Sequence, residues 1–315
     1  MTRSGTTPGH GIAAGDGEVD SSMWSSEHLD LDAYLSRLGY EGDRMPTLET
    51  LRALQRAHVL TVRWDTLDSF LYREVRLDVP SVQDKLVRRG RGGYCYEHVV
   101  LFAAALEKLG FRFTAVSGRV QLGADSTSPR PATHAMLIVD LDGTRWLSDV
   151  GFGDSPLEPI ELVDGGRGGT DPWPYLLRWQ DITHGSPGWA VHQRGGDPEG
   201  PEGWVVRQVF TETPQYPVDY AVGNHFVATH DRSPFVTRPY IQRRRTDRHD
   251  TLDALVWTTE RPGRERVTRT VGPHEVPQLL DDVFGICTDP EEARLLVIRL
   301  RELDSARHRP GSTPR

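Results

Sequence analysis

The sequence contains few cysteines and no long apolar run. Cys95 and Cys287 are the only cysteines among 315 residues. This scarcity excludes a small scaffold held together by disulfides and fits a reducing compartment, so we expect a cytoplasmic protein. No stretch of about 18 apolar residues is present, and we therefore expect no membrane span and no membrane partner. Residues 1–20 also lack the apolar segment of a signal peptide.

Positive charge is scarcer than negative charge. Lysine and arginine number 37 against 45 aspartates and glutamates, and the formal net charge is −8 at pH 7. This balance argues against a general nucleic-acid binder, and an anionic ligand would need a local basic site. The length suits one large domain or two to three small ones, with enough apolar residues for real cores.

The first third of the chain reads as helices that follow a tail rich in Gly, Ser and Thr. Apolar positions recur at helical spacing in four stretches, residues 29–38, 47–62, 81–90 and 94–110. Thr47 and Ser81 are candidate N-caps for the second and third of these helices. Gly110 is a candidate C-cap for the fourth helix, which has the clearest apolar face.

The remainder changes to short runs with partial alternation, separated by turn residues. The middle third holds six such runs, at residues 111–122, 134–141, 145–152, 174–179, 189–194 and 203–210. They predict an antiparallel sheet that closes toward a barrel. After Asn224, we expect two more strands, at 251–259 and 264–271, and two short helices, at 273–285 and 289–303.

Cys95 stands just after a glycine pair, at the start of the strongest predicted helix and just before an apolar run. Gly92 and Gly93 allow a tight turn, and the helix is expected to begin within a residue or two of the cysteine. The unpaired N–H groups and the dipole of a helix N-terminus favour a thiolate over a thiol and could stabilise an oxyanion. On this local context alone, Cys95 could be either a nucleophile or a small buried side chain.

A second element supplies a base and an orienting group for such a nucleophile. Asp142-Gly143 is a strong signal for a two-residue hairpin loop. With that loop, His134 faces Gly151, and Asp149 falls on the same sheet face, diagonal to His134. A carboxylate there can hold one imidazole nitrogen and leave the other free. A three-residue loop would reverse the facing, and each residue alone could be structural.

A metal site is the rival interpretation of the cysteine. Cys95 and His98 are three residues apart and could share a helix face, but zinc needs two further ligands, and Cys287 has no neighbouring His or Cys. We therefore expect no metal, and we expect His98 to be a structural hydrogen-bonding residue beneath the helix. The loop that follows Asp149 is glycine-rich, and Gly151–Gly153 could bring backbone N–H groups close to a phosphate.

The segments RGGYCYEH, THAML and DVGFG together resemble the arylamine N-acetyltransferases. The stretches LDAYLSRLGYEG, PTLETLRALQRAHV and FVATHDRSPFV resemble other landmarks of that family, so the likeness covers roughly residues 28 to 300. It implies an α+β fold with an N-terminal helical bundle, a central antiparallel β-barrel and a C-terminal α/β lid. A cysteine-protease-like Cys-His-Asp site would lie between the first two. The expected parts are a disordered tail at 1–26, the bundle at 27–110, the barrel at 111–222, the lid at 223–304 and a loose tail at 305–315.

The resemblance also implies a reaction. The family's catalytic triad falls on Cys95, His134 and Asp149. An acetyl group would pass from acetyl-CoA to the cysteine and then to an arylamine or hydrazine, in a ping-pong scheme with no permanently bound cofactor. Gly151, Phe152 and Gly153 resemble the segment near the coenzyme A pyrophosphate, and Phe152 also resembles a residue that lines the acceptor pocket.

The chain departs from the family's pattern in the support of this site. The family's Pro-Phe-Glu-Asn element corresponds to residues 62–66, where Asp65 and Thr66 replace the Glu and Asn that hold the arginine of the cysteine motif. The resemblance therefore implies that Arg91 is anchored by Asp65. Val99 stands where the family usually has asparagine.

Three other functions stay open. The departures leave room for an amide synthase of the ansamycin type, or another N-acyltransferase of secondary metabolism, which would take a larger acyl group from a thioester on coenzyme A or a carrier protein. A cysteine hydrolase of the transglutaminase-like superfamily has the same triad order. A ligand-binding module with a structural Cys95 is the non-enzymatic alternative.

Overall fold

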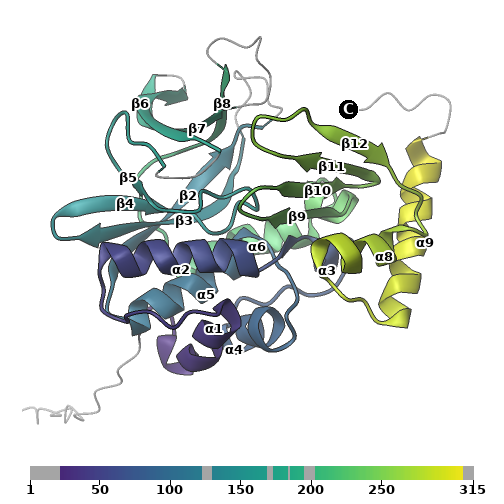
Figure 1. The fold of residues 1–315 in the computed structure, drawn as a ribbon, viewed down its shortest axis with the longest axis horizontal. Coiled ribbons are helices and arrows are strands. Elements are labelled where there is room, and N and C mark those ends of the chain that lie inside the picture. Colours follow the sequence, from purple (N-terminus) through teal and green to yellow (C-terminus); the bar gives the residue numbers. More distant parts are fainter. Residues whose placement is uncertain (1–21, 123–129, 169–172, 184, 195–202, 308–315) are drawn as a thin grey trace, which may run out of the picture.

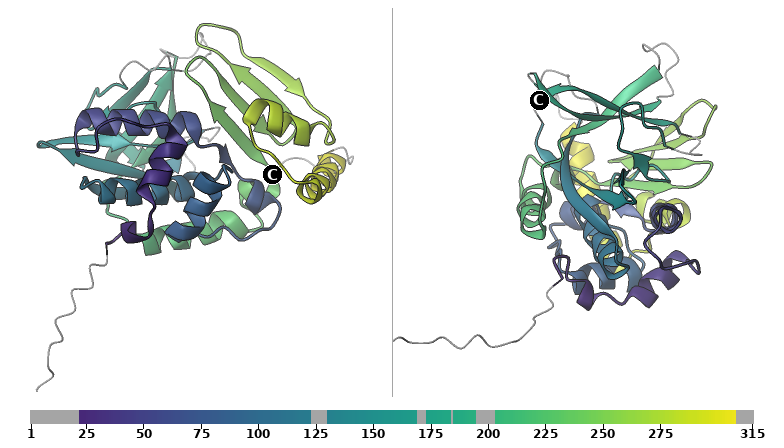
Figure 2. Two further views of the ribbon diagram at one scale, coloured as in Figure 1. Left: turned by 60° about the horizontal axis from the view of Figure 1, so that its bottom comes forward. Right: turned by 90° about the vertical axis from the view of Figure 1, so that its left-hand side faces the viewer.

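The computed structural model describes residues 22–122, 130–168, 173–183, 185–194 and 203–307. Helices of the N-terminal third lie below a β-barrel, and a five-stranded sheet with α8 and α9 stands beside both (Figure 1). The left view of Figure 2 shows the barrel and the five-stranded sheet on opposite sides of the molecule. The expected tails at 1–26 and 305–315 fall largely outside the described residues. Where they overlap, Trp24 is buried and α9 continues to Arg307.

The N-terminal part is helical, as predicted. Its helices are α1 (Leu31–Leu38), α2 (Leu48–Thr61), α3 (Leu67–Phe70), α4 (Val79–Gln83) and α5 (Cys95–Lys108). The hydroxyl of Thr47 accepts a hydrogen bond from the Thr50 N–H, which confirms the predicted cap of α2. Helix α5 is buried along most of its length. Val99, which stands where the family usually has asparagine, lies wholly in the core.

The third helix differs from the prediction at its start. Helix α4 begins two residues before Ser81, and the carboxylate of Asp78 caps it by accepting from the Ser81 N–H at 3.0 Å. Pro80 occupies the first turn, where its missing N–H costs nothing. The segment then continues as a π-helical turn, Asp84–Arg88.

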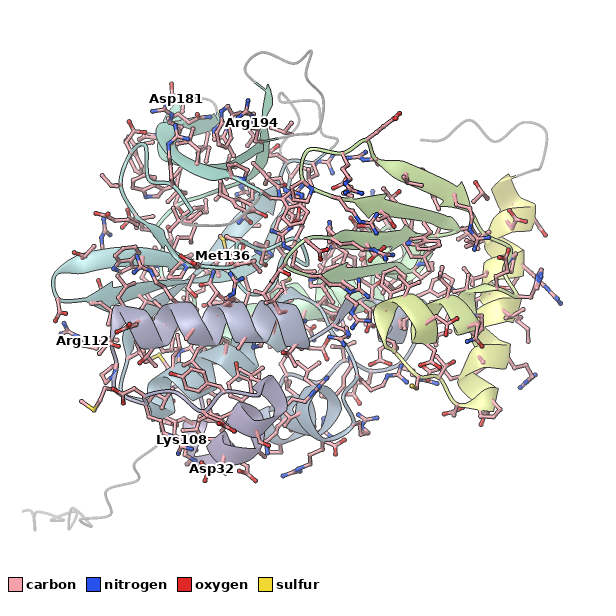
Figure 3. All side chains as sticks on the ribbon, in the orientation of Figure 1. Asp32, Lys108, Arg112, Met136, Asp181 and Arg194 are labelled. Atoms are coloured by element: carbon pink, nitrogen blue, oxygen red, sulfur yellow. The ribbon has the colours of Figure 1, made fainter. Side chains whose placement is uncertain are left out.

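Among the described residues, seven antiparallel strands form the barrel. They are β2 (Arg112–Val120), β3 (Ala132–Leu141), β4 (Thr144–Ser148), β5 (Ile160–Glu161), β6 (Tyr175–Thr183), β7 (Ser186–Arg194) and β8 (Trp204–Phe210). Their order is β5-β4-β3-β2-β8-β7-β6. The chain that follows β5 bonds to β6, through Gly165 N to Leu177 O at 2.9 Å, so the sheet closes almost completely. Met136 lies inside, whereas Asp181 and Arg194 lie at the far end of the barrel (Figure 3).

The second sheet has the order β1-β9-β10-β11-β12. Its strands are β1 (Trp64–Asp65), β9 (Tyr240–Arg244), β10 (His249–Asp253), β11 (Val256–Glu260) and β12 (Val267–Thr270). The single strand predicted at 251–259 is wrong, because the chain turns at Ala254, where φ is 54°, and β10 pairs with β11. Strand β1 joins this sheet from the helical third of the sequence.

Helices complete the third part. They are α6 (Pro217–Thr229), α7 (Pro234–Thr237), α8 (Val276–Leu279) and α9 (Pro290–Arg307), with a π-helical turn at Leu280–Phe284. The two C-terminal helices were predicted, but α6 was not. The expected boundary between residues 222 and 223 falls inside α6. Within the described ranges, no helix combines the length and the apolar character needed to cross a bilayer.

Candidate functional site

Cys95 is the first residue of α5. The carboxylate of Glu97 accepts a hydrogen bond from the N–H of Tyr94 at 3.1 Å, which fixes where the helix starts. The thiol is buried, and its Sγ lies 3.5 Å from the carbonyl oxygen of Thr133 on β3. The predicted placement of the cysteine at a helix N-terminus is therefore confirmed, and the sulfur faces the barrel.

The glycine pair before the cysteine is held from both sides. The N–H of Gly93 donates to Arg63 O at 3.1 Å, and Gly93 O accepts from the N–H of Asp65 at 2.9 Å. A Cβ on Gly92 would overlap the carboxylate of Asp65. The turn is thus packed so closely against β1 that a side chain at Gly92 would push it out of place.

His134 and Asp149 meet as the hairpin argument predicted. Leu141 pairs with Thr144, and both Asp142 and Gly143 have positive φ, as a two-residue type I′ loop requires. The regular ladder ends at Ser148, so Asp149 is the residue just past the strand. Its Oδ2 lies 2.9 Å from Nε2 of His134, and both side chains are buried. Because Nε2 binds the carboxylate, Nδ1 is left for Cys95.

The electrostatics of this pair favour a charged imidazole. Burial lowers the pKa of His134, but the charge of Asp149 and its hydrogen bond, followed by Cys95, outweigh burial and raise the pKa to about 10. Burial raises the pKa of Asp149, yet His134, Gln208 and the N–H of Gly151 bring it below the ordinary value. At neutral pH the pair is therefore an imidazolium bound to a carboxylate.

Three further groups donate hydrogen bonds to Asp149. Two of them are side chains, Ser155 and Gln208, that the sequence did not predict. The N–H of Gly151 donates to Oδ1 at 3.0 Å, and the hydroxyl of Ser155 donates to the same oxygen at 3.3 Å. The side-chain amide of Gln208 on β8 donates to Oδ2 at 2.9 Å. Ser155 could have been suspected from its place in the glycine-rich loop, but Gln208 carries no local signal.

The loop after Asp149 is packed directly on Cys95. A Cβ on Gly151 would lie 2.8 Å from Cα of Cys95, so only glycine fits there. The indole N–H of Trp64 donates to Gly151 O at 2.6 Å and fixes the direction of that carbonyl. Trp64 also packs edge-on against Phe235 and Tyr240. Gly151 is therefore held in direct contact with Cys95.

Phe152 and Gly153 connect the His134–Asp149 pair to the second sheet. The ring of Phe152 is edge-on to that of His134, with centroids 5.0 Å apart. The side-chain amide of Gln242 on β9 donates to Phe152 O at 3.2 Å. Gly153 has φ 85°, and a Cβ on it would overlap Gln242. The Gly151–Gly153 segment thus lies between Cys95 and β9.

The prediction that Asp65 anchors Arg91 is wrong. The guanidinium binds Glu292 at the start of α9, with Nη1 2.6 Å from Oε2 and Nη2 2.5 Å from Oε1. Asp65 accepts from the N–H of Leu67 through Oδ1, while its buried Oδ2 finds no hydrogen-bond donor in the described part of the chain. Asp65 has lost one methylene relative to the family's glutamate, and Glu292 supplies the carboxylate instead.

His98 takes the structural role predicted for it. Its Nε2 lies 3.1 Å from both Arg63 O and Gly93 O, so it donates to the turn before Cys95. Its Nδ1 then accepts from Nε2 of His58 at 3.0 Å, and Nδ1 of His58 accepts from the hydroxyl of Tyr34 at 2.7 Å. Burial lowers the pKa of His98 to about 4, so this chain of hydrogen bonds is neutral at pH 7.

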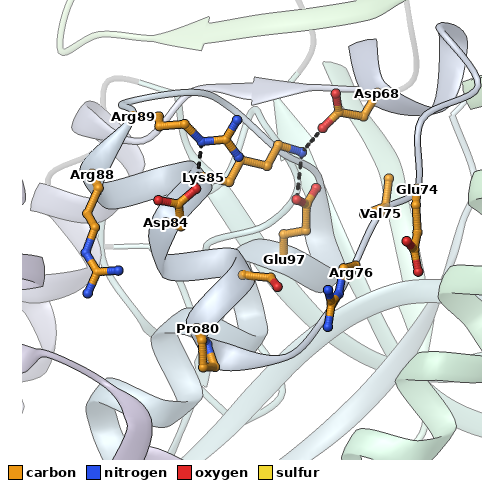
Figure 4. A pocket seen from close by; sticks show the side chains of 11 residues that line it. Asp68, Glu74, Val75, Arg76, Pro80, Asp84, Lys85, Arg88, Arg89 and Glu97 are labelled. Atoms are coloured by element: carbon orange, nitrogen blue, oxygen red, sulfur yellow. Dashed lines mark hydrogen bonds and ion pairs between the residues drawn. The ribbon is translucent and has the colours of Figure 1, made fainter.

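A cavity of about 470 Å³ opens beside the first turn of α5 (Figure 4). Lys85 lies in its wall and bridges Asp68 and Glu97, with both N–O distances 2.7 Å. Neither Cys95, His134 nor Asp149 lines it. Since Glu97 also holds the N–H of Tyr94, the bridge supports the cap of α5 and does not contact Cys95, His134 or Asp149.

Comparison with known proteins places the chain among acetyl-transferring enzymes. A family model described as N-acetyltransferase matches residues 47–293. An arylamine N-acetyltransferase of Mycolicibacterium smegmatis is 39% identical over 214 residues, which are 66% of this chain and 74% of that protein. The structure of the arylamine N-acetyltransferase from Mycobacterium abscessus superposes with a TM-score of 0.84 at 48% identity, and covers 89% of this chain and 97% of its own.

A third comparison is with a structure that contains CoA. The structure of Mycobacterium marinum arylamine N-acetyltransferase in complex with CoA is similar, with a TM-score of 0.76 and 32% identity. It covers 87% of this chain and 99% of its own length. The likeness therefore spans the helical part, the barrel and the second sheet together.

Proposed function

Because this chain belongs to the arylamine N-acetyltransferase family, we propose that it transfers an acetyl group from acetyl-CoA to the nitrogen of an arylamine or hydrazine. The transfer passes through a thioester on Cys95. Acetyl-CoA is a substrate in this scheme, and the protein acts in the cytoplasm. The observation that carries the proposal is the buried ion pair of His134 and Asp149, 2.9 Å apart and next to Cys95.

In the first half-reaction, Cys95 is the nucleophile. Its thiolate, paired with the imidazolium of His134, attacks the carbonyl carbon of the acetyl thioester and forms a new C–S bond. The N–H groups at the start of α5 are unpaired within the helix and stabilise the oxyanion. The old C–S bond then breaks, and the departing CoA thiolate takes the proton from His134.

In the second half-reaction, the neutral His134 acts as a general base. The amine nitrogen attacks the carbonyl carbon of the acetyl-cysteine, and its proton moves to His134. The C–S bond to Cys95 breaks, which restores the thiolate and imidazolium. Asp149 holds Nε2 throughout, so Nδ1 stays directed at the reacting atoms.

The Gly151–Gly153 segment is the proposed binding element for coenzyme A. It adjoins Cys95 on one side and Gln242 on the other. Phe152 is the proposed wall of the acceptor pocket, because its ring packs on His134. Arg91, through Glu292, and Asp65 support the turn before Cys95.

A donor and acceptor screen tests the proposal. Acetyl-CoA and thioesters with larger acyl groups are each incubated with the protein, and acylation of Cys95 is read by mass spectrometry of the intact chain. The proposal expects an acetyl adduct that an arylamine or hydrazine discharges as its N-acetyl derivative. Acylation only by larger thioesters would favour an amide synthase. Release of free acetate without transfer to any amine would favour a hydrolase.

A further inference from the structure

Four arginines gather where β9 meets the π-helical turn that follows α8 (Figure 1). One directly precedes β1, one lies on β9, and two lie in the turn from β9 to β10. In chain order they are Arg63, Arg243, Arg245 and Arg248. The chain as a whole carries a formal net charge of −8, so this local excess of positive charge runs against its overall balance.

The cluster lies on the face of the second sheet that points away from Cys95. On the opposite face, the side chains of Trp64 and Gln242 donate hydrogen bonds to the glycine-rich loop beside Cys95. Successive residues of an extended chain point to opposite faces, so the neighbouring Arg63 and Arg243 point the other way. Any ligand of this cluster is therefore separate from the reacting atoms.

Backbone carbonyls hold one edge of each of these two guanidiniums. Nε of Arg63 donates to Phe284 O at 2.7 Å, and its Nη1 donates to Thr61 O. Nη1 of Arg243 donates to Val283 O at 2.8 Å. Nη2 of both arginines and Nε of Arg243 find no acceptor among the described residues, and none of these atoms is sealed from solvent. The carbonyls thus fix both guanidiniums without neutralising them.

Only one carboxylate in the described ranges pairs with the four arginines. Asp250 accepts from Arg245 at 2.6 Å and from Arg248 at 2.5 Å, and its side chain is completely buried. Arg63 and Arg243 form no ion pair with it or with any other described carboxylate. A surplus of positive charge therefore remains on these two arginines.

The pKa shifts agree with this surplus. Burial lowers the pKa of Arg63 to about 10, and the charges of three other arginines, led by Arg243, add to the effect. Burial and the charge of Arg245 lower the pKa of Arg243 and outweigh the attraction of Asp250. A bound anion would relieve the repulsion that both guanidiniums experience.

A glycine borders the space between the two guanidiniums. Gly285 ends the π-helical turn with φ 67°. A Cβ on it would lie 3.2 Å from Nη2 of Arg63 and 3.3 Å from Nη1 of Arg243, so both groups converge on this glycine. The absence of a side chain here leaves room for an oxygen of a ligand.

We propose that Arg63, Arg243 and the backbone of Gly285 form a binding site for a phosphate group. The N–H groups of a guanidinium match the geometry of phosphate oxygens, and a phosphate carries more negative charge than a carboxylate. The group belongs to inorganic phosphate or to a larger ligand such as coenzyme A. This inference goes beyond the proposed acetyl transfer, and its readout is binding alone.

The first arm of the test uses inorganic phosphate as the probe. Calorimetry in a buffer of low ionic strength gives its Kd for the wild type, Arg243→Gln and Arg243→Lys. The Kd should rise about 10- to 100-fold in Arg243→Gln, and less in Arg243→Lys, which keeps the charge but loses the planar fork. Arg112→Gln removes the same charge from an exposed position of β2 and should leave the Kd unchanged.

The second arm keeps every arginine and fills the space at the glycine. Gly285→Ala should weaken phosphate binding about 10-fold, because its Cβ lies where both guanidiniums converge. Gly263→Ala is the matched control, since Gly263 has φ 66° with no atom near its missing Cβ, and carries the same backbone strain. Circular dichroism checks the folding of each variant, and this pair decides if Arg243→Gln does not fold.

The third arm separates the two sources of the phosphate group. If coenzyme A supplies it, CoA displaces inorganic phosphate, and the Kd of CoA rises about 10-fold in Arg243→Gln. If inorganic phosphate is the ligand, it binds together with CoA, and the Kd of CoA stays the same. The proposal is overturned if the wild type shows no saturable phosphate binding, or if Arg243→Gln and Gly285→Ala both bind phosphate as the wild type does.

Discussion

The guanidinium of Arg91 binds the carboxylate of Glu292 through two hydrogen bonds, although 201 residues separate them in the sequence. Arg91 precedes the glycine turn of the nucleophile, and Glu292 stands at the start of α9. The C-terminal helix is thereby tied to the element that places Cys95. The family's pattern instead led us to expect a partner on residues 62–66.

The first prediction concerns this pair. Glu292→Gln should lower the free energy of unfolding by about 2 kcal/mol, because a nearly buried charge pair is broken while Arg91 keeps some contact with water. Alkylation of Cys95 by iodoacetamide should also slow. Urea unfolding and alkylation kinetics measure both effects. Glu291→Gln is the control, since Glu291 is exposed on the same turn, and it should change stability by less than about 0.5 kcal/mol. If both variants had the same unfolding free energy and the same rate of Cys95 alkylation, Glu292 would have no role in supporting the site.

The second prediction concerns Gln208, a positioning residue that acts through Asp149. Gln208→Ala removes a hydrogen bond to a buried carboxylate and should lower kcat about 10-fold, with little change in KM for the acyl donor. Gln208→Glu should do at least as badly, because a second carboxylate cannot donate to Asp149. The exposed Gln180 on β6 provides the control Gln180→Ala. A loss confined to KM would speak against a role through Asp149.

The third prediction uses the raised pKa of His134. The folded pKa of about 10 exceeds the ordinary value of 6.5, so its contribution to stability is complete below pH 6.5 and is lost as the pH rises toward 10. Asp149→Asn removes the main cause of the raised pKa, and burial then favours the neutral ring. The fall in unfolding free energy between pH 6.5 and 10 should shrink in this variant, and alkylation of Cys95 at pH 7 should slow about 10-fold or more. An unchanged alkaline slope would contradict the ion pair.

The fourth prediction concerns the neutral histidine chain. Burial lowers the folded pKa of both His58 and His98, and that of His98 to about 4, so their contribution is present above pH 6.5 and is lost as the pH falls toward 4. In His98→Gln, the drop in stability over this window should be smaller by up to about 3 kcal/mol.

Between pH 4 and 6.5, Glu97 changes stability in the opposite direction to the histidines. Burial raises the pKa of Glu97 to about 7, and its contribution falls as the pH rises. Glu97 is present in both proteins, so the difference between wild type and His98→Gln reports the histidine. His225→Gln, at an exposed position of α6, should leave the acid drop unchanged. If stability fell equally in His98→Gln and in the wild type, protonation of His98 would not be coupled to unfolding.

The parts of the site that the sequence predicted are those set by local geometry. A two-residue loop at Asp142-Gly143 fixes the register of β3 against β4, and the register brings His134 and Asp149 together. The glycine pair and the following apolar pattern fix where α5 begins. Each of these follows from residues close together in the chain.

The parts that escaped prediction depend on distant contacts. Glu292 meets Arg91 because α3, the second sheet and α9 share one hydrophobic core. Gln208 meets Asp149 across the barrel, next to the bulge at Arg207 in β8. No local pattern marks either contact. Helix α6 was missed because its sequence combines Pro, Val and Gly with weak helical periodicity, and its stability comes from the barrel and α5 on which it packs.

The most direct test of the account is a single-turnover acetylation of Cys95. The protein, in slight excess over acetyl-CoA, is first acetylated, and samples are quenched and digested before and after addition of an arylamine. Mass spectrometry then follows the peptide that carries Cys95. The account predicts one acetyl group on Cys95, its disappearance with the amine, and an equal amount of N-acetylated amine, with none of these in Cys95→Ala. N-acetylated amine formed by Cys95→Ala at the wild-type rate, or an acetyl group on another residue that serves the transfer, would contradict it.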